Sequence, residues 1–203
     1  MKEKYIIGLT GGIGSGKTLV LELLKTHYNA MIIEADKVGH ELQMPGETAY
    51  NCIIKQFGTA VLEEPCLMGS SPINRKKLGD MVFSDETKLK LLNDIMHPAI
   101  HNRIECMIKS SDSKVIVLEA AILTETSLIH LVNELWYIYA EKNIRLERLQ
   151  NGRNISKEKA LLVMSNQPDD DYFRKKSDII IDNSLSEEYT LNQINKVMKN
   201  SKS

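Results

Sequence analysis

Short apolar runs alternate along the chain with longer segments in which apolar residues recur every three or four positions. Five of the runs, rich in β-branched and aromatic residues, predict buried strands at Tyr5–Thr10, Ala30–Ile33, Lys114–Glu119, Leu135–Ala140 and Asp178–Asp182. Periodic segments between and after them predict helices at Lys17–Tyr28, Asn143–Leu149, Ser156–Asn166 and Leu191–Met198. This alternation predicts an α/β fold, with a five-stranded parallel sheet covered by helices on both faces.

The longest departure from this alternation runs from Lys37 to Ile108. Its first half contains turn signals and predicts short helices joined by loops. Its second half, Asp85–Ile108, is strongly periodic but contains Pro98, which lacks an amide proton and clashes with the preceding turn. We therefore expect a break there, with Pro98 at the first position of a new helix and His97 at its cap.

The chain of 203 residues suits one domain with an insertion. We expect a single domain over residues 1–203, built as a three-layer sandwich, with its core at about 1–36 and 112–203. The helical insertion at about 37–111 is the candidate substrate-binding subdomain. A small lid is expected at about 150–157, where Gly152-Arg153-Asn154 interrupts the helical pattern.

Composition and charge limit the kinds of partner that we expect this chain to bind. Hydrophobic residues make up 42% and charged residues 26% of the chain, and the net charge of -1 gives no basic field for nucleic acid or membrane. Cys52, Cys66 and Cys106 are widely spaced and form no CxxC pair, which fits a reducing cytoplasm. No apolar run reaches the length of a membrane span, and Tyr5–Leu9 is too short for a secretory signal. The sequence leaves the oligomeric state open.

The segment Gly11–Thr18 reads GGIGSGKT and fits the phosphate-loop pattern G-x-x-x-x-G-K-[ST]. It lies between a predicted strand and a predicted helix, where backbone N–H groups and the helix N-terminus can cradle phosphates. The residues expected to bind ATP are Gly11, Gly12, Ile13, Gly14, Ser15, Gly16, Lys17 and Thr18. Lys17 would reach the β- and γ-phosphates, and the Thr18 hydroxyl would ligate Mg²⁺.

Several classes of enzyme use such a loop. A guanine-reading switch needs Asn-Lys-x-Asp, but the chain's Asn195-Lys196 pair is followed by Val197-Met198. The small size, the helical insertion and Arg153 at the expected lid favour a small-molecule kinase over a nucleotide hydrolase. Another P-loop kinase and a non-kinase hydrolase remain the alternatives, and a preference for ATP over GTP cannot be read from these residues.

Longer segments resemble one family. GLTGGIGSGKT at residues 8–18 and IIEAD at residues 32–36 are similar to the opening of dephospho-coenzyme A kinases. Further segments agree in order and spacing at residues 74–85, 91–100, 145–149 and 167–184. The second contains His97-Pro98, and the last contains Ile181-Asp182-Asn183. Together these segments span residues 5 to about 185 of the chain.

The resemblance implies a fold of the nucleoside monophosphate kinase-like type and a reaction. The ribose 3′-hydroxyl of dephospho-coenzyme A would attack the γ-phosphate of ATP, with Mg²⁺, to give coenzyme A and ADP. Asp36 would orient and deprotonate that hydroxyl, with a helix-capping carboxylate as its structural alternative. Lys17 would neutralise phosphate charge.

Other roles come from the same resemblance. Arg153, with Arg148, would close over the phosphates of ATP, although either could be a solvated arginine at a helix end. Arg75 and His97 would lie at the acceptor site, with a surface arginine as the alternative for Arg75. Glu119 could approach Mg²⁺ through water or could be a plain carboxylate at a strand end.

The chain departs from the family pattern in several places. Glu34 stands where the family has Asp, and Ala121 and Thr124 fall in a segment that usually contains proline and phenylalanine. The lid arginine is expected at Gly152 but stands one residue later, at Arg153. Leu185 replaces a glycine. These departures bear most on the lid.

Overall fold

The computed structural model describes residues 4–63, 71–120, 123–153 and 155–200. The chain forms two compact units: residues 1–33 with 111–203 make unit 1, and residues 34–110 make unit 2. Each unit is described by itself. Cys66, Ala121 and Asn154, which the sequence analysis singled out, lie outside the described residues, as does the side chain of Arg153.

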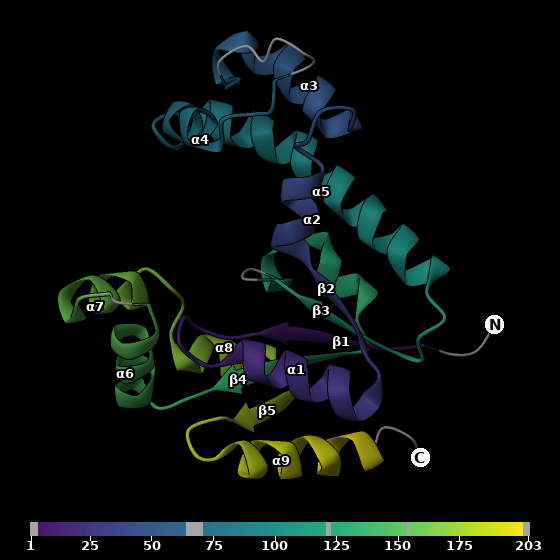
Figure 1. Cartoon of the computed structure of the whole chain (residues 1–203), viewed down its shortest axis with the longest axis vertical. Helices are drawn as coiled ribbons and strands as arrows, with labels where there is room; N and C mark the ends of the chain where they lie inside the picture. The colour runs from purple at the N-terminus through teal and green to yellow at the C-terminus, as the bar shows by residue number, and fades with distance from the viewer. Residues whose placement is uncertain (1–3, 64–70, 121–122, 154, 201–203) are drawn as a thin grey trace. The chain divides into compact units, whose positions relative to one another are not determined.

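Unit 1 is built on a five-stranded parallel sheet with the strand order β2-β3-β1-β4-β5 (Figure 1). The strands are β1 (Tyr5–Thr10), β2 (Met31–Glu34), β3 (Val115–Glu119), β4 (Glu134–Tyr139) and β5 (Ile179–Asp182). The central strand β1 pairs with β3 from Tyr5–Val115 to Leu9–Glu119 and with β4 on its other side. The predicted α/β fold and parallel sheet are confirmed.

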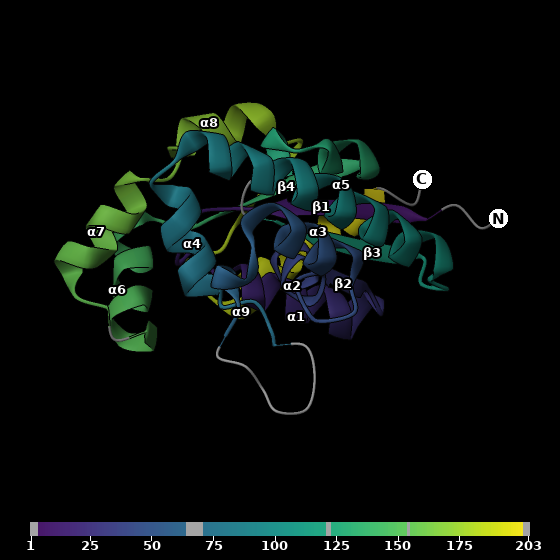
Figure 2. The ribbon, with the colours of Figure 1, turned by 90° about the horizontal axis from the view of Figure 1, so that it is seen from above.

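Alternate residues of the strands face two helical layers. One face carries Ile7, Leu9, Trp136 and Ile138, which pack against α1 (Lys17–Tyr28) and α9 (Glu187–Asn200) (Figures 1 and 2). On the other face, Tyr137 stacks on Phe173 of α8 (Asp170–Lys176), with ring centroids 5.0 Å apart. The segment η2 (Leu123–Glu125) also belongs to this face, because a side chain at Gly8 would meet Leu123, and η3 (Ser127–Leu131) contacts η2.

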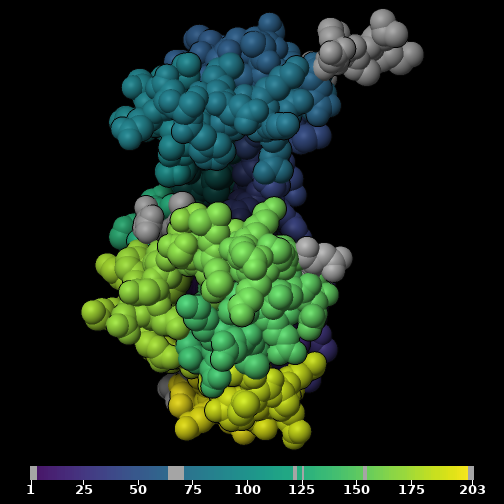
Figure 3. Space-filling view, turned by 90° about the vertical axis from the view of Figure 1, so that its left-hand side faces the viewer, coloured from purple at the N-terminus to yellow at the C-terminus, as the bar shows by residue number. Residues whose placement is uncertain are grey.

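Two helices follow β4 and precede α8. They are α6 (Lys142–Arg153) and α7 (Lys157–Ser165), which pack together through Leu146, Leu149 and Ala160. Figure 3 shows their green atoms gathered on one face of unit 1. Ser156 caps α7 by accepting a hydrogen bond from the Lys159 amide, as predicted.

The start and end of α6 differ from the prediction. The helix begins at Lys142, so Asn143 lies inside it rather than at its cap, and it continues through Gly152 to Arg153. Glycine costs about 1 kcal/mol relative to alanine in a helix but does not forbid one. Packing of Leu149 against α7 offsets that cost near the end of the helix.

Unit 2 is helical. Its elements are α2 (Ala35–Glu41), α3 (Thr48–Phe57), η1 (Thr59–Val61), α4 (Arg75–Phe83) and α5 (Glu86–Ser110). The helices α2, α3 and α4 each pack on α5. Buried residues from all four helices, including Val38, Ile53, Leu78 and Ile104, form its interior. The prediction of short helices before a strongly periodic segment is confirmed.

The expected break at Pro98 is wrong, because α5 runs without interruption for 25 residues with Pro98 inside it. Both Pro98 and Asp94, whose carbonyl lies four residues back, are exposed. Water can therefore hydrogen-bond the carbonyl that the missing N–H leaves unpaired. Packing along the rest of α5 holds the helix on both sides of the proline, so His97 is not a cap.

Asp36 lies just beyond β2 rather than in it. β2 ends at Glu34, and Asp36 is an exposed residue in the first turn of α2. Across the described parts of the chain, no helix combines the length and apolar character of a membrane span.

Candidate functional site: the phosphate loop and its supports

The glycine-rich segment connects β1 directly to α1, so its backbone lies at the carboxyl end of the central strand. Gly16 precedes the helix with φ of 85°, a left-handed conformation that favours glycine. A side chain at Gly16 would also overlap the amide nitrogen of Asn183. Glycine at position 16 therefore allows the turn from the loop into the helix. The N–H groups of the loop lie next to the positive N-terminal end of α1, a helix of 12 residues.

Lys17 is the first residue of α1, and its side chain folds back over the loop. Its Nζ donates a hydrogen bond of 2.8 Å to the Gly11 carbonyl and lies 3.7 Å from Glu119 Oε1. Glu119 ends β3, the strand that pairs with β1. The structure thus brings a lysine and a carboxylate from neighbouring strand ends to one side of the loop.

Thr18 follows Lys17 in the first turn of α1, and its side chain is exposed. Mg²⁺ bound with a nucleotide needs only one or two protein oxygens, since phosphates and water supply the rest. The exposed Thr18 hydroxyl, with the Glu119 carboxylate 3.7 Å from the ammonium of the preceding Lys17, fits such an ion. No cluster of three or more His, Cys, Asp or Glu side chains suited to a metal occurs among the residues that the structure describes.

Asn183, directly after β5, supports the inner side of the loop. It is 1% exposed, donates to the Ser15 carbonyl at 2.8 Å and accepts from the Thr190 hydroxyl at 2.9 Å. Arg148 donates to the carbonyls of the same two residues, at 3.2 Å to Ser15 and 2.8 Å to Asn183. The loop, the end of β5 and α6 are therefore linked through buried and partly buried hydrogen bonds.

The N–H and the carbonyl of Ile13, in the phosphate loop, are both hydrogen-bonded to side chains from later in the chain. Its N–H donates to Gln167 Oε1 at 2.7 Å, and its carbonyl accepts from Arg145 Nε at 2.9 Å. Arg145 comes from α6, and Gln167 follows α7. The two helices beyond β4 are thus tied to the phosphate loop by side chains.

A second set of contacts holds Arg145 from behind. Its Nη1 lies 3.6 Å from Asp170 Oδ1, and the Tyr137 hydroxyl donates to the same oxygen at 2.6 Å. Burial, followed by that hydrogen bond, raises the pKa of Tyr137 far above its ordinary value. Tyr137 therefore stays protonated and acts as a hydrogen-bond donor.

These supporting residues were not assigned by sequence reasoning. Arg145, Gln167 and Asn183 fall inside segments that resemble the family, but their roles emerge only from the hydrogen bonds, which join positions more than 130 residues apart. One available signal is the position of Asn183 directly after the last strand. The carboxyl ends of parallel strands meet at one edge of a sheet.

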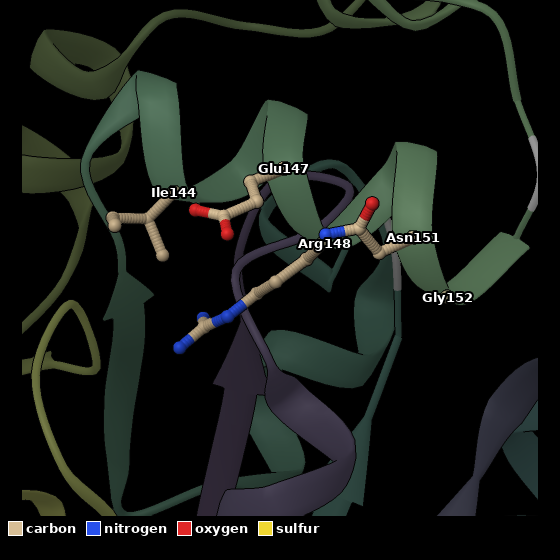
Figure 4. Close-up of a pocket in the computed structure, with 5 residues that line it drawn as sticks. All are labelled: Ile144, Glu147, Arg148, Asn151 and Gly152. Carbon is tan, nitrogen blue, oxygen red and sulfur yellow. The ribbon is translucent and has the colours of Figure 1, made fainter.

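A pocket of about 480 Å³ lies along α6 and is lined by Ile144, Glu147, Arg148, Asn151 and Gly152. Figure 4 shows the Arg148 side chain extending from the helix, with Ile144 and Glu147 on the same stretch of α6. Arg148 is thus both a support of the loop and a wall of an open pocket. The pocket also includes the residue before Arg153, the last residue of α6.

The predicted acceptor-site residues lie in unit 2. Arg75 is the first residue of α4, directly after the cap Asn74, and His97 lies in the middle of α5. The side chains of Arg75, His97 and Asp36 are all exposed. The helices that carry them, α4 and α2, both pack on α5, so one helical unit presents all three.

A phosphate loop between the central strand and the first helix of a parallel sheet, with two arginines of a later helix beside it, defines a P-loop phosphotransferase. The described residues add a separate helical unit after β2. A family model described as dephospho-CoA kinase matches residues 5–188, and the chain belongs to that family.

Relatives agree with this assignment. The chain is 34% identical over 198 residues to a dephospho-CoA kinase of Halalkalibacterium halodurans, covering 96% of this chain and 95% of the relative. It is 38% identical over 192 residues to one of Carboxydothermus hydrogenoformans, covering 93% of this chain and 90% of the relative. The resemblance in the sequence is confirmed along nearly the whole chain.

Solved structures support the fold. A Thermus thermophilus protein superposes with a TM-score of 0.83 at 23% identity, covering 100% of both chains. The dephospho-CoA kinase of Campylobacter jejuni gives 0.61 at 24% identity and 97% coverage of both chains. A shikimate kinase of Acinetobacter baumannii gives 0.54 at 12% identity, with 98% of this chain and 96% of that chain covered. The P-loop kinase architecture is therefore confirmed.

Proposed function

We propose that this enzyme transfers the γ-phosphoryl group of ATP to the ribose 3′-hydroxyl of dephospho-CoA, giving coenzyme A and ADP. The observation that carries the proposal is the family match over residues 5–188, which includes every residue assigned a role below. The intact phosphate loop supports the nucleotide half of the reaction. The chain's own residues then divide into a phosphate-binding set in unit 1 and an acceptor-binding set in unit 2.

In the first set, the N–H groups of residues 11–18 and the Lys17 ammonium hold the phosphates of ATP. Lys17 is positioned for this because its Nζ already lies over the loop at the Gly11 carbonyl. Thr18 and Glu119 would hold Mg²⁺, directly or through water, and the ion when bound neutralises charge on the β- and γ-phosphates. Arg148, which lines the pocket along α6, and Arg153, the last residue of that helix, would contact the nucleotide.

In the second set, Asp36 would accept the proton of the acceptor hydroxyl and orient its oxygen for in-line attack. Asp36 lies two residues beyond β2, whose carboxyl end belongs to the same edge of the parallel sheet as the phosphate loop. Arg75 and His97 would bind the acceptor. We propose residues 37–111 as the acceptor-binding insertion and residues 150–157 as the lid.

A cytoplasmic location is part of the proposal. The described cysteines, Cys52 and Cys106, are exposed and not disulfide-bonded. Exposed thiols persist in reducing compartments. Synthesis of a thiol-bearing cofactor suits the same environment.

The test measures ADP formation by purified enzyme with ATP and Mg²⁺, first alone and then with dephospho-CoA. We expect ADP to form in proportion to dephospho-CoA consumed. Equal ADP formation without acceptor would identify a nucleotide hydrolase. Shikimate and AMP serve as competing acceptors, and faster transfer to either would assign the enzyme to another P-loop kinase activity.

A further inference from the structure

The guanidinium of Arg145 lies against the phosphate loop at Gly12 and Ile13. Its Nε donates to the Ile13 carbonyl at 2.9 Å, and a side-chain carbon at Gly12 would overlap its Nη2. The residue is only 8% exposed. Gly12 therefore leaves open the space that the guanidinium fills beside the loop.

The buried charge of Arg145 is only partly compensated. Its one ion-pair partner among the described residues is Asp170, at 3.6 Å from Nη1, and the Asp170 side chain is 41% exposed. The Asp170 oxygen nearest to Arg145 also accepts a hydrogen bond from the Tyr137 hydroxyl. A buried cation is costly unless it is closely paired, and a solvated carboxylate at this distance gives limited compensation. An anion bound in the loop would complete the pairing.

Arg148 provides the contrast. It lies on the same helix, but its two terminal nitrogens donate to the carbonyls of Ser15 and Asn183. Each of these two terminal nitrogens therefore already holds a carbonyl of the loop or of its support. In Arg145 the Nε makes the loop contact, so the terminal nitrogens lie at Gly12 and toward Asp170.

The loop's own N–H groups cradle the inner phosphates of a nucleotide, leaving charge on the terminal phosphate to be balanced by cations. We propose that Arg145 is a catalytic residue that contacts the γ-phosphoryl group of ATP and stabilises its charge during transfer. This inference rests on the proposed kinase function. No second protein would be needed to supply this arginine. Asp170 and Tyr137 would be positioning residues that hold the Arg145 guanidinium in place.

The bond changes are those of phosphoryl transfer. The acceptor oxygen forms a bond to the γ-phosphorus while the bond from that phosphorus to the β,γ-bridging oxygen breaks, and the acceptor proton passes to Asp36. ADP leaves with the bridging oxygen. Arg145 donates hydrogen bonds to the transferring group throughout and exchanges no proton.

The experiment compares wild type with Arg145→Gln, Arg145→Lys and Arg174→Gln. The last variant is a matched control, because Arg174 is an exposed arginine of the same unit whose guanidinium stacks 4.6 Å from the Tyr139 ring centroid. Two quantities are measured: kcat with dephospho-CoA, and the affinities for Mg²⁺–ADP with and without aluminium fluoride. Aluminium fluoride bound beside ADP mimics the transferring phosphoryl group.

We expect Arg145→Gln to lower kcat by about 100-fold or more, the range found when one preorganised charge-stabilising donor is removed. The affinity for ADP should be retained, and the tightening caused by aluminium fluoride should be lost. Arg145→Lys should show a smaller loss, since it keeps the charge without the planar fork. Arg174→Gln should match wild type.

Equal weakening of ADP and ADP–aluminium fluoride binding in Arg145→Gln would overturn the proposal and make Arg145 a structural clamp. Wild-type behaviour of Arg145→Gln would overturn it as well. If Arg145→Gln does not fold, Arg145→Lys decides between the same outcomes. If wild type shows no ADP formation dependent on dephospho-CoA, the proposed function fails, but the aluminium fluoride measurement still tests Arg145.

Discussion

At the scale of single residues, the phosphate loop is readable from sequence and its supports are not. The glycines, Lys17 and Thr18 form a local motif whose spacing carries its chemistry. Asn183, Gln167 and Arg145 reach the loop from more than 130 residues away, so their contacts depend on the folded sheet. Hydrophobic periodicity and composition therefore do not predict these long-range hydrogen bonds.

Asn183→Ala should destabilise the protein by about 2 kcal/mol, because it leaves the buried Thr190 hydroxyl with only its longer bond of 3.3 Å to the Ser186 carbonyl and removes a donor to the Ser15 carbonyl. Urea denaturation with matched m-values measures the change. Asn102→Ala, at an exposed helical position, is the control and should stay within about 0.5 kcal/mol of wild type. A change in Asn183→Ala as small as the control's would show that these bonds do not stabilise the fold.

Asp36→Asn should retain ATP binding and lose about 100-fold or more in kcat, the contribution typical of a positioned general base. The amide keeps the size of the side chain but cannot accept the hydroxyl proton. Calorimetric titration with an ATP analogue and steady-state kinetics give the two readouts. Asp80→Asn, an exposed carboxylate of the same unit, is the matched control. Near-normal turnover in Asp36→Asn would leave Asp36 with only a structural role in α2.

At the scale of elements, strands and long helices follow the hydrophobic pattern closely, whereas helix ends and breaks do not. β1 and α1 have the predicted bounds. Pro98 and Gly152 were expected to interrupt helices, yet both lie inside them. Glycine or proline inside a helix costs about one to three kcal/mol, which is small beside the free energy gained by burying a long apolar face. Packing therefore decides whether the helix continues through such a residue. The sequence shows the penalty but not the partner helix.

Pro98→Ala should therefore raise the free energy of unfolding, by about 2 kcal/mol. Alanine restores the N–H that can bond the Asp94 carbonyl and removes the ring clash, a gain of about 3 kcal/mol in a helix interior. Loss of proline's restraint on the unfolded chain returns up to about 1 kcal/mol. Thermal unfolding and amide exchange along α5 measure the result. A destabilised Pro98→Ala would mean that the packing on α5 requires a bend at the proline.

At the scale of the whole molecule, the chain divides its proposed work between two units. The sheet unit carries the phosphate loop and its supports, and the helical unit carries Asp36, Arg75 and His97. The order of segments along the chain made the family recognisable from sequence, and the family match over residues 5–188 confirms it. The acceptor is named through the family, so the product of the reaction is the decisive observable.

The most direct test of the account is the structure of that product. Enzyme, ATP, Mg²⁺ and dephospho-CoA are incubated, and the nucleotide product is analysed by mass spectrometry and phosphorus and proton NMR. We predict one added phosphoryl group, carried on the ribose 3′-oxygen, with one ADP formed for each product molecule. A phosphoryl group on another oxygen, or unchanged dephospho-CoA beside accumulating ADP, would contradict the account.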